Sequence, residues 1–125
     1  MANENNMLNN ELDFMTRANS KLNPLAPKSG LLLIGNNGVE FQAEKSPGYI
    51  QIPWSSITEV SVQMFFKGKY VRGFFIETDE DQLLEFIVSD AKEALRNMRK
   101  YLKREQFVST PSNLGQLFRR KKKEK

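Results

Sequence analysis

The residues with the clearest potential for chemistry are carboxylates gathered around one predicted turn. They are Glu77, Asp79, Glu80, Asp81 and Glu85. Carboxylate oxygens bind Ca²⁺ and Mg²⁺, but the spacing matches no known calcium loop. A solvated acidic turn is therefore the stronger prediction. Paired carboxylates also serve glycoside hydrolysis, yet a chain of 125 residues offers little room for the cleft that this reaction needs.

Cysteine and histidine are both absent from the sequence. Their absence excludes disulfides, thiolate and imidazole metal sites, and serine or cysteine nucleophiles activated by histidine. Glycine-rich phosphate loops are missing as well. We therefore expect a binding module and not an enzyme, with no cofactor, no metal and no small-molecule substrate.

Charge is divided unevenly along the chain. Residues 1–91 hold 7 basic and 12 acidic residues, a balance of −5, whereas residues 92–125 hold 12 basic and 3 acidic residues, a balance of +9. A mildly acidic body thus carries a strongly basic C-terminal quarter. This asymmetry predicts an anionic partner at that end.

Apolar and polar residues alternate through residues 49–88 with the period of half-buried strands. The predicted inward faces comprise Ile50, Ile52 and Trp54; Val60, Val62, Met64 and Phe66; Phe74 and Ile76; and Leu84, Phe86 and Val88. Lys67-Gly68-Lys69 suits a tight hairpin connection. Trp54 is in register with its neighbours, so packing in the core is favoured over a role as an exposed anchor, and Pro53 is expected to end its strand.

The N-terminal half predicts further strands. A weaker pattern runs through Leu12 and Phe14, followed by strands at residues 30–34 and 39–43. Between these two strands, Asn36-Asn37-Gly38 is a strong hairpin signal because Asn-Gly accepts positive φ angles. Residues 1–10 are rich in asparagine and predict disorder.

Residues 90–104 predict one helix of about fifteen residues. Asp90 is placed to cap it, with Glu93 at capping-box spacing. The buried stripe is predicted to comprise Ala91, Ala94, Leu95, Met98, Tyr101 and Leu102. The opposite side is predicted to expose Lys92, Arg96, Arg99, Lys100, Lys103 and Arg104.

Together these elements predict a mainly β domain of about seven antiparallel strands closed by a C-terminal helix, as in small sandwiches or barrels. We expect a disordered start at residues 1–10, a domain at 11–105 and a basic amphipathic tail at 106–125. No apolar run approaches the length of a membrane span, and no secretory signal is evident.

The predicted tail combines an apolar face with a run of cations. Leu114, Leu117 and Phe118 follow i, i+3, i+4 spacing immediately before Arg119, Arg120, Lys121, Lys122 and Lys123. This layout is typical of a short interfacial anchor on an anionic membrane. The alternative, left open here, is that the apolar residues dock on the domain. Contact with nucleic acid is disfavoured because no recognition motif is present.

Several sequence blocks resemble a small bacterial family, the ManO-like proteins (domain of unknown function 956), found with mannose-class phosphotransferase systems. The resemblance covers about residues 12–118. The matching blocks are Tyr49-Ile50-Gln51-Ile52-Pro53-Trp54, Phe66-Lys67-Gly68-Lys69, Arg72 with Phe74, Ile76 and Thr78, and Arg99-Lys100-Tyr101-Leu102. The resemblance implies a cytoplasmic accessory or regulatory protein of sugar uptake. More loosely, the element order resembles pleckstrin-homology-like and GRAM-like domains, which does not assign a ligand.

These observations define two alternative functional hypotheses. In the first, Lys67, Lys69, Tyr70 and Arg72 bind a protein subunit of a mannose-class phosphotransferase system at the inner membrane face, while the tail raises the local concentration. In the second, the basic helix residues Arg96, Arg99, Lys100 and Lys103, together with the tail, bind an anionic lipid or nucleic acid. For the hairpin, a merely solvated turn whose lysines discourage strand pairing is a further alternative.

Overall fold

The computed structural model describes residues 7–21, 27–45 and 49–109. Within them it contains eight strands and one α-helix. In chain order the elements are β1 (Leu12–Ser20), β2 (Lys28–Gly35), β3 (Gly38–Ala43), β4 (Tyr49–Pro53), β5 (Ile57–Phe65), β6 (Tyr70–Thr78), β7 (Leu83–Val88), α1 (Ala91–Met98) and β8 (Phe107–Ser109). Short 3₁₀ turns at Trp54–Ser56 and Arg104–Gln106 precede β5 and β8. In the described part of the chain, no helix has the length and apolar character that crossing a bilayer requires.

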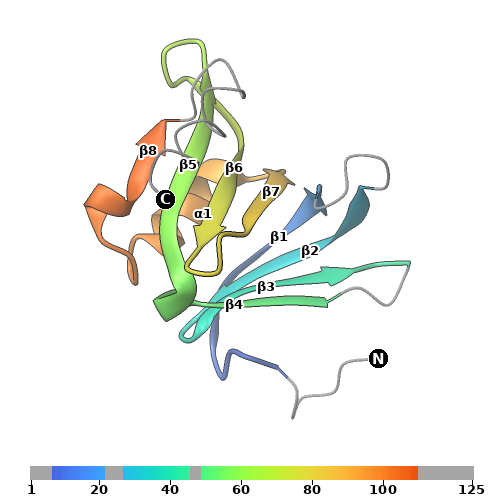
Figure 1. Ribbon diagram of the computed structural model, residues 1–125. Coiled ribbons are helices and arrows are strands. Elements are labelled where there is room, and N and C mark those ends of the chain that lie inside the picture. Colours follow the sequence, from blue (N-terminus) through green and yellow to red (C-terminus); the bar gives the residue numbers. More distant parts are fainter. Residues whose placement is uncertain (1–6, 22–26, 46–48, 110–125) are drawn as a thin grey trace.

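All eight strands belong to one open sheet with the order β4-β3-β2-β1-β7-β6-β5-β8. Strands β1–β4 and β5–β7 each form an antiparallel meander. The two meanders meet where Ala18 pairs with Val88 and Ser20 with Phe86. Figure 1 shows the two halves turned strongly against each other, with the β5–β6 turn projecting at the top of the view.

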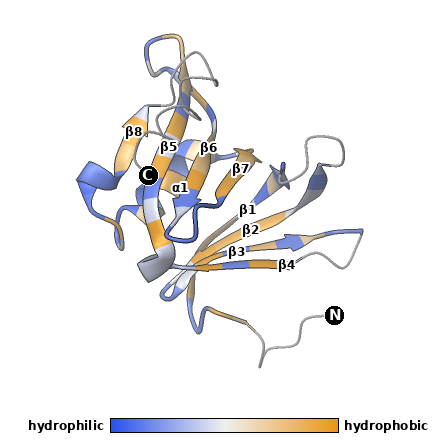
Figure 2. Ribbon diagram, in the orientation of Figure 1, coloured by the Kyte–Doolittle hydropathy of each residue, from blue (hydrophilic) through white to orange (hydrophobic). Residues whose placement is uncertain are grey.

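The hydrophobic core draws side chains from both halves and from α1. Phe41 of β3, Phe74 of β6 and Phe86 of β7 are fully or almost fully buried. The ring centroid of Phe86 lies 5.8 Å from that of Phe41 and 6.3 Å from that of Phe74. One aromatic cluster therefore connects the two halves. In Figure 2 the strands that form the core carry hydrophobic residues, whereas the β6–β7 turn is hydrophilic.

The prediction of about seven strands, all antiparallel, is wrong in one respect. The seven predicted strands are present, but an eighth, Phe107–Ser109, lies parallel to β5 with Val60 opposite Phe107. These residues fall in the segment that we expected to be an amphipathic tail. The strand was missed because three residues are too few to establish a period of two.

The helix is shorter than the fifteen residues predicted, because α1 ends at Met98. Asn97 is buried, and its amide donates to the carbonyl of Glu93 at 2.9 Å, a local bond that competes with a continuing helix. The side chain of Asp90 makes no capping bond, and Glu93 pairs with Arg96 instead of completing a capping box. The inner stripe is confirmed at Ala91, Ala94 and Met98, and Leu102 is buried beyond the helix end.

The predicted inward face of β5 is correct only for its first half. Val60 and Val62 are buried, whereas Met64 and Phe66 are exposed. The pairing register of β5 with β6 shifts between Gln63 and Met64. Such a bulge changes the direction of the strand. Residues that continue the alternation of Val60 and Val62 therefore no longer face the core after the bulge.

Candidate interaction surface on the β5–β6 hairpin

The β5–β6 hairpin ends in a turn, residues 66–69, that leaves the sheet. Phe66, Lys67 and Gly68 all have positive φ angles, of 55°, 58° and 88°. Backbone hydrogen bonds close the turn, since Gly68 N donates to Phe65 O at 3.1 Å and Lys69 N donates to Phe66 O at 3.2 Å. The tight connection predicted at Lys67-Gly68-Lys69 is therefore confirmed, one residue longer than the motif suggested.

Large apolar side chains concentrate at this hairpin. Phe66 is 76% exposed, and Met64, Phe65 and Tyr70 are 46%, 43% and 52% exposed. The rings of Phe65 and Tyr70 lie side by side across the hairpin, with centroids 6.1 Å apart. Contiguous exposed apolar side chains of this kind mark contact surfaces more often than folding requirements.

Cations accompany these apolar residues. Lys67, Lys69 and Arg72 are all exposed, and residues 64–72 contain no acidic residue. The four residues that we predicted to bind a partner thus lie on one hairpin, together with Met64, Phe65 and Phe66. We call these seven residues the hairpin surface. Sequence analysis missed the apolar part because its alternation assigned Met64 and Phe66 to the core.

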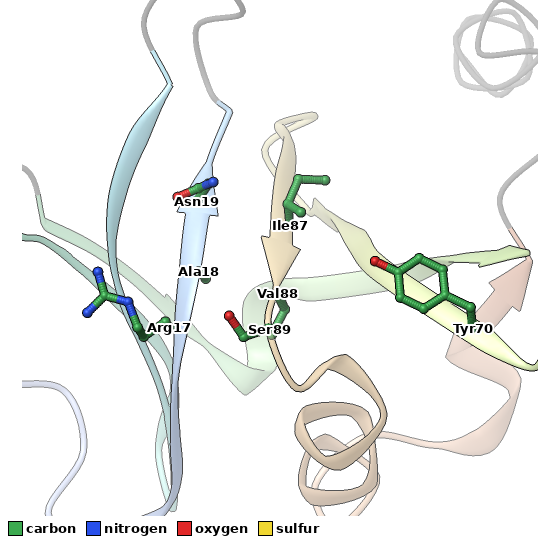
Figure 3. Close-up of a pocket in the computed structure, with 7 residues that line it drawn as sticks. All are labelled: Arg17, Ala18, Asn19, Tyr70, Ile87, Val88 and Ser89. Carbon is green, nitrogen blue, oxygen red and sulfur yellow. The ribbon is translucent and has the colours of Figure 1, made fainter.

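A hollow of about 350 Å³ lies beside Tyr70, between the hairpin and the β1–β7 junction. It is lined by Arg17, Ala18, Asn19, Tyr70, Ile87, Val88 and Ser89. Figure 3 shows Asn19 on β1 and Ser89 just after the end of the adjacent strand β7, with the Tyr70 ring facing them across Ile87. The guanidinium of Arg17 turns to Glu44, at 2.5 Å, so the hollow has a polar wall but no free cation directed into it.

The predicted basic helix face is exposed but dispersed. Arg96, Arg99, Lys100 and Lys103 are all at the surface, and Arg96 is paired with Glu93. Because α1 ends at Met98, only Arg96 of these four lies on it. The tail residues Leu114, Leu117, Phe118 and Arg119, Arg120, Lys121, Lys122 and Lys123 lie outside the described residues.

The acidic side chains around the β6–β7 turn do not form a metal centre. Within residues 7–21, 27–45 and 49–109, no three metal-binding side chains lie close enough together to hold an ion. Asp79, Glu80 and Asp81 are exposed. Their turn is instead closed by Thr78, whose backbone N donates to Gln82 O at 3.0 Å.

A buried carboxylate, Glu40, was not singled out from the sequence. It is fully buried on β3 and accepts hydrogen bonds from Leu8 N at 3.0 Å and from Asn9 N at 3.1 Å. Tyr49 and Gln51 of β4 also donate to this carboxylate, at Oε1, the oxygen that accepts from Leu8 N. Residues 8–10, which we expected to be disordered, therefore pack on the sheet. The only sequence signal was an acidic residue between Val39 and Phe41, two apolar residues of the strand.

This network shifts the pKa values of two residues, Glu40 and Tyr49. Burial alone would raise the pKa of Glu40, but the hydrogen bonds from Tyr49, Leu8, Asn9 and Gln51 outweigh burial and hold it below its ordinary value. Burial and the hydrogen bond to Glu40 raise the pKa of Tyr49 to about 12. Glu40 is therefore ionised near neutral pH and serves structure.

Trp54, the one tryptophan of the chain, packs as predicted. It is partly buried against the core, and its indole N–H donates to Gly35 O at 3.0 Å. Its remaining face is covered by Tyr101. We therefore leave Trp54 out of the candidate surface.

The fold and the hairpin surface define a small, mainly β module with one helix, whose most prominent feature is an exposed apolar and cationic turn. This chain belongs to the family described as a domain of unknown function, DUF956, whose model matches residues 4–121. No curated protein matches the sequence.

Solved structures share the fold. One of them is the C-terminal domain of an unknown protein from Leishmania infantum, with a TM-score of 0.63 and 14% sequence identity. The match covers 72% of this chain and 82% of that one. At this identity the likeness concerns the fold alone.

Proposed function

We propose that this protein is a non-catalytic accessory or regulatory module of a mannose-class sugar phosphotransferase system. It binds a protein component of the transporter at the cytoplasmic face of the membrane and acts by occupancy. The resemblance of its Ile-Gln-Ile-Pro-Trp and Phe-Lys-Gly-Lys blocks to the ManO-like proteins supports the link to sugar uptake.

The observation that carries the proposal is the hairpin surface. Four large apolar side chains are exposed on one hairpin beside three cations. Aromatic and arginine side chains are the residues that most often dominate binding energy at protein interfaces. Tyr70, which lines the hollow, and Arg72, two residues further along β6, are the best candidates for such contacts.

We further propose a pleckstrin-homology-like relationship for the fold. Two antiparallel meanders of four and three strands, joined through β1 and β7 and followed by a helix, support this assignment. Strand β8 is an addition to that plan. The relationship suggests a scaffold that presents binding loops, and it does not identify the ligand.

The test is affinity capture from detergent-solubilised membranes of the native host. The full chain is compared with a hairpin variant, Lys67→Glu/Lys69→Glu/Arg72→Glu, and with a matched variant of equal charge change, Arg99→Glu/Lys100→Glu/Lys103→Glu. We expect transporter subunits to be recovered by the full chain and by the matched variant, at low and high salt, and to be lost with the hairpin variant.

Two outcomes would contradict the proposal. Recovery of no transporter subunit by the full chain would remove the proposed partner. Loss of binding in the matched variant alone, together with a steep decline as salt is raised, would favour the second hypothesis, an anionic lipid or nucleic-acid binder that uses the basic helix and tail.

A further inference from the structure

The end of the hairpin surface at the turn differs from its flank, which is the part on β6. Phe66 is the most exposed of the large apolar residues described, and Met64 and Phe65 adjoin it, whereas Tyr70 and Arg72 lie beyond the turn on β6, where Tyr70 lines the hollow. We call Met64, Phe65 and Phe66, with Lys67 and Lys69, the apex. Figure 1 shows that the turn carrying Phe66 and Lys67 projects beyond the sheet.

A projecting turn with exposed apolar side chains can enter an interface that deforms around it, such as the surface of a bilayer. The apolar part of a bilayer accepts side chains freely, but it offers backbone groups no hydrogen bonds. At the apex this requirement is met within the protein for part of the backbone. Gly68 N and Lys69 N both donate within the turn, and Lys69 O accepts from the Lys92 ammonium at 3.0 Å.

The charges around the apex favour one kind of bilayer. Lys67 and Lys69 flank the aromatic side chains and Lys92 lies beside them, while no acidic residue occurs in residues 64–72. Lysine side chains can reach the headgroup layer while their neighbours enter the acyl region. Cations close to a membrane are attracted by anionic headgroups.

We propose that the apex inserts into the interfacial layer of an anionic membrane, with Phe66 and Phe65 entering the acyl boundary and Lys67 and Lys69 contacting headgroup phosphates. The inference rests on the proposed function for the hairpin as the contact surface. It refines that function, because it assigns the apex to lipid and leaves the flank at Tyr70 and Arg72 for the protein partner.

The first experiment is sedimentation of the full chain with vesicles of phosphatidylglycerol and phosphatidylcholine, and with vesicles of phosphatidylcholine alone. We compare the unaltered protein with Phe66→Ser and with Met15→Ser, which replaces a side chain that is 54% exposed on β1. Phe66→Ser should weaken binding to the anionic vesicles by about tenfold or more, because the phenyl ring that enters the bilayer is lost. Met15→Ser should not change binding.

The second experiment locates the apex in the bilayer. A Phe66→Trp variant is mixed with anionic vesicles that contain lipids brominated along the acyl chain, and the unaltered protein, with Trp54 as its one tryptophan, is the control. Insertion predicts a blue shift and quenching of the added tryptophan only. Because the vesicles contain no protein partner, this result is independent of the capture experiment.

Several outcomes would overturn the inference. They are an absence of binding to anionic vesicles, binding that Phe66→Ser leaves unchanged, and binding without quenching at position 66, which would place the contact in the basic tail. A dimeric unaltered protein and a monomeric Phe66→Ser variant, neither of which binds vesicles, would assign the apex to a second copy of the chain. Loss of subunit capture in detergent by Phe66→Ser would assign it to the protein partner.

Discussion

Trp54 and Tyr101 stack face to face, with ring centroids 4.8 Å apart and planes inclined by 13°. Trp54 lies in the 3₁₀ turn after β4, and Tyr101 lies just beyond the end of α1. The Tyr101 hydroxyl also donates to the carboxylate of Asp13 on β1. A single aromatic pair therefore connects three parts of the chain that the strand ladder does not bring together.

Trp54→Ala should destabilise the protein more than Tyr101→Phe, a substitution in the residue that stacks on Trp54. We expect Trp54→Ala to lower the free energy of unfolding by about 3 kcal/mol, because packing, the bond to Gly35 and the stacking are all lost. Tyr101→Phe, which retains the ring, should cost less than about 1 kcal/mol. Urea denaturation of both variants measures this difference, and equal losses would contradict the prediction.

The Glu40 network predicts a dependence of stability on pH. Because the pKa of Glu40 is lowered in the folded protein, its contribution is complete above the unfolded pKa of about 4.3 and is lost as pH falls through the folded pKa. Glu40→Gln should be less stable than the unaltered protein at pH 7, and the gap should narrow in acid. The check is urea denaturation at a series of pH values between neutral and about pH 3.

A control for this prediction is Glu44→Gln, at a carboxylate on the surface that pairs with Arg17 at 2.5 Å. Exposed ion pairs contribute about 0 to 1 kcal/mol, so this substitution should barely change the pH profile. A gap between Glu40→Gln and the unaltered protein that stays constant with pH would indicate lost packing and not lost charge.

Gly73 is predicted to tolerate no side chain. A Cβ atom there would lie 2.0 Å from Phe86 O and 2.9 Å from Ile87 Cα, both in the backbone of β7. Gly73→Ala should therefore destabilise the protein by about 3 kcal/mol or prevent folding. Gly68→Ala, in the open turn at φ 88°, should cost only about 1 kcal/mol. Thermal unfolding ranks the two variants, and a similar melting temperature for both would contradict the prediction.

Ending the chain at Thr110 tests the predicted basic tail. The core and all eight described strands lie before this position, so the melting temperature should change little. Recovery with host membranes should fall, because five consecutive cations are removed, each contributing about 1 kcal/mol near an anionic surface. Recovery equal to that of the full chain would count against the tail.

The strands were predictable because their inward residues repeat with a period of two. Leu84, Phe86 and Val88 are buried as the pattern required, and Phe74 and Ile76 likewise. The same rule failed at Met64 and Phe66, because a bulge shifts the register and no local residue signals it. Apolar composition alone cannot distinguish a core position from a contact position.

Features that depend on distant partners could not be predicted. Glu40 is buried because Leu8, Asn9 and Tyr49 supply its hydrogen bonds, and these residues approach only after folding. Tyr101 continued the helical stripe in sequence, but stacking on Trp54 and a turn after Met98 place it elsewhere. The cations of the candidate site and Tyr70 were found from sequence, whereas the exposure of Met64 and Phe66 required the structure.

The junction between β1 and β7 also affects how the chain is made. Ala18 must pair with Val88, so about seventy further residues must be synthesised before β1, the edge strand of the first meander, gains its second neighbour. At typical elongation rates that interval is on the order of a few seconds. During synthesis the side of β1–β4 that later holds Leu32, Ile34 and Phe41 has no partner sheet, so nascent chains stalled before β7 would be the form most prone to aggregation and chaperone capture.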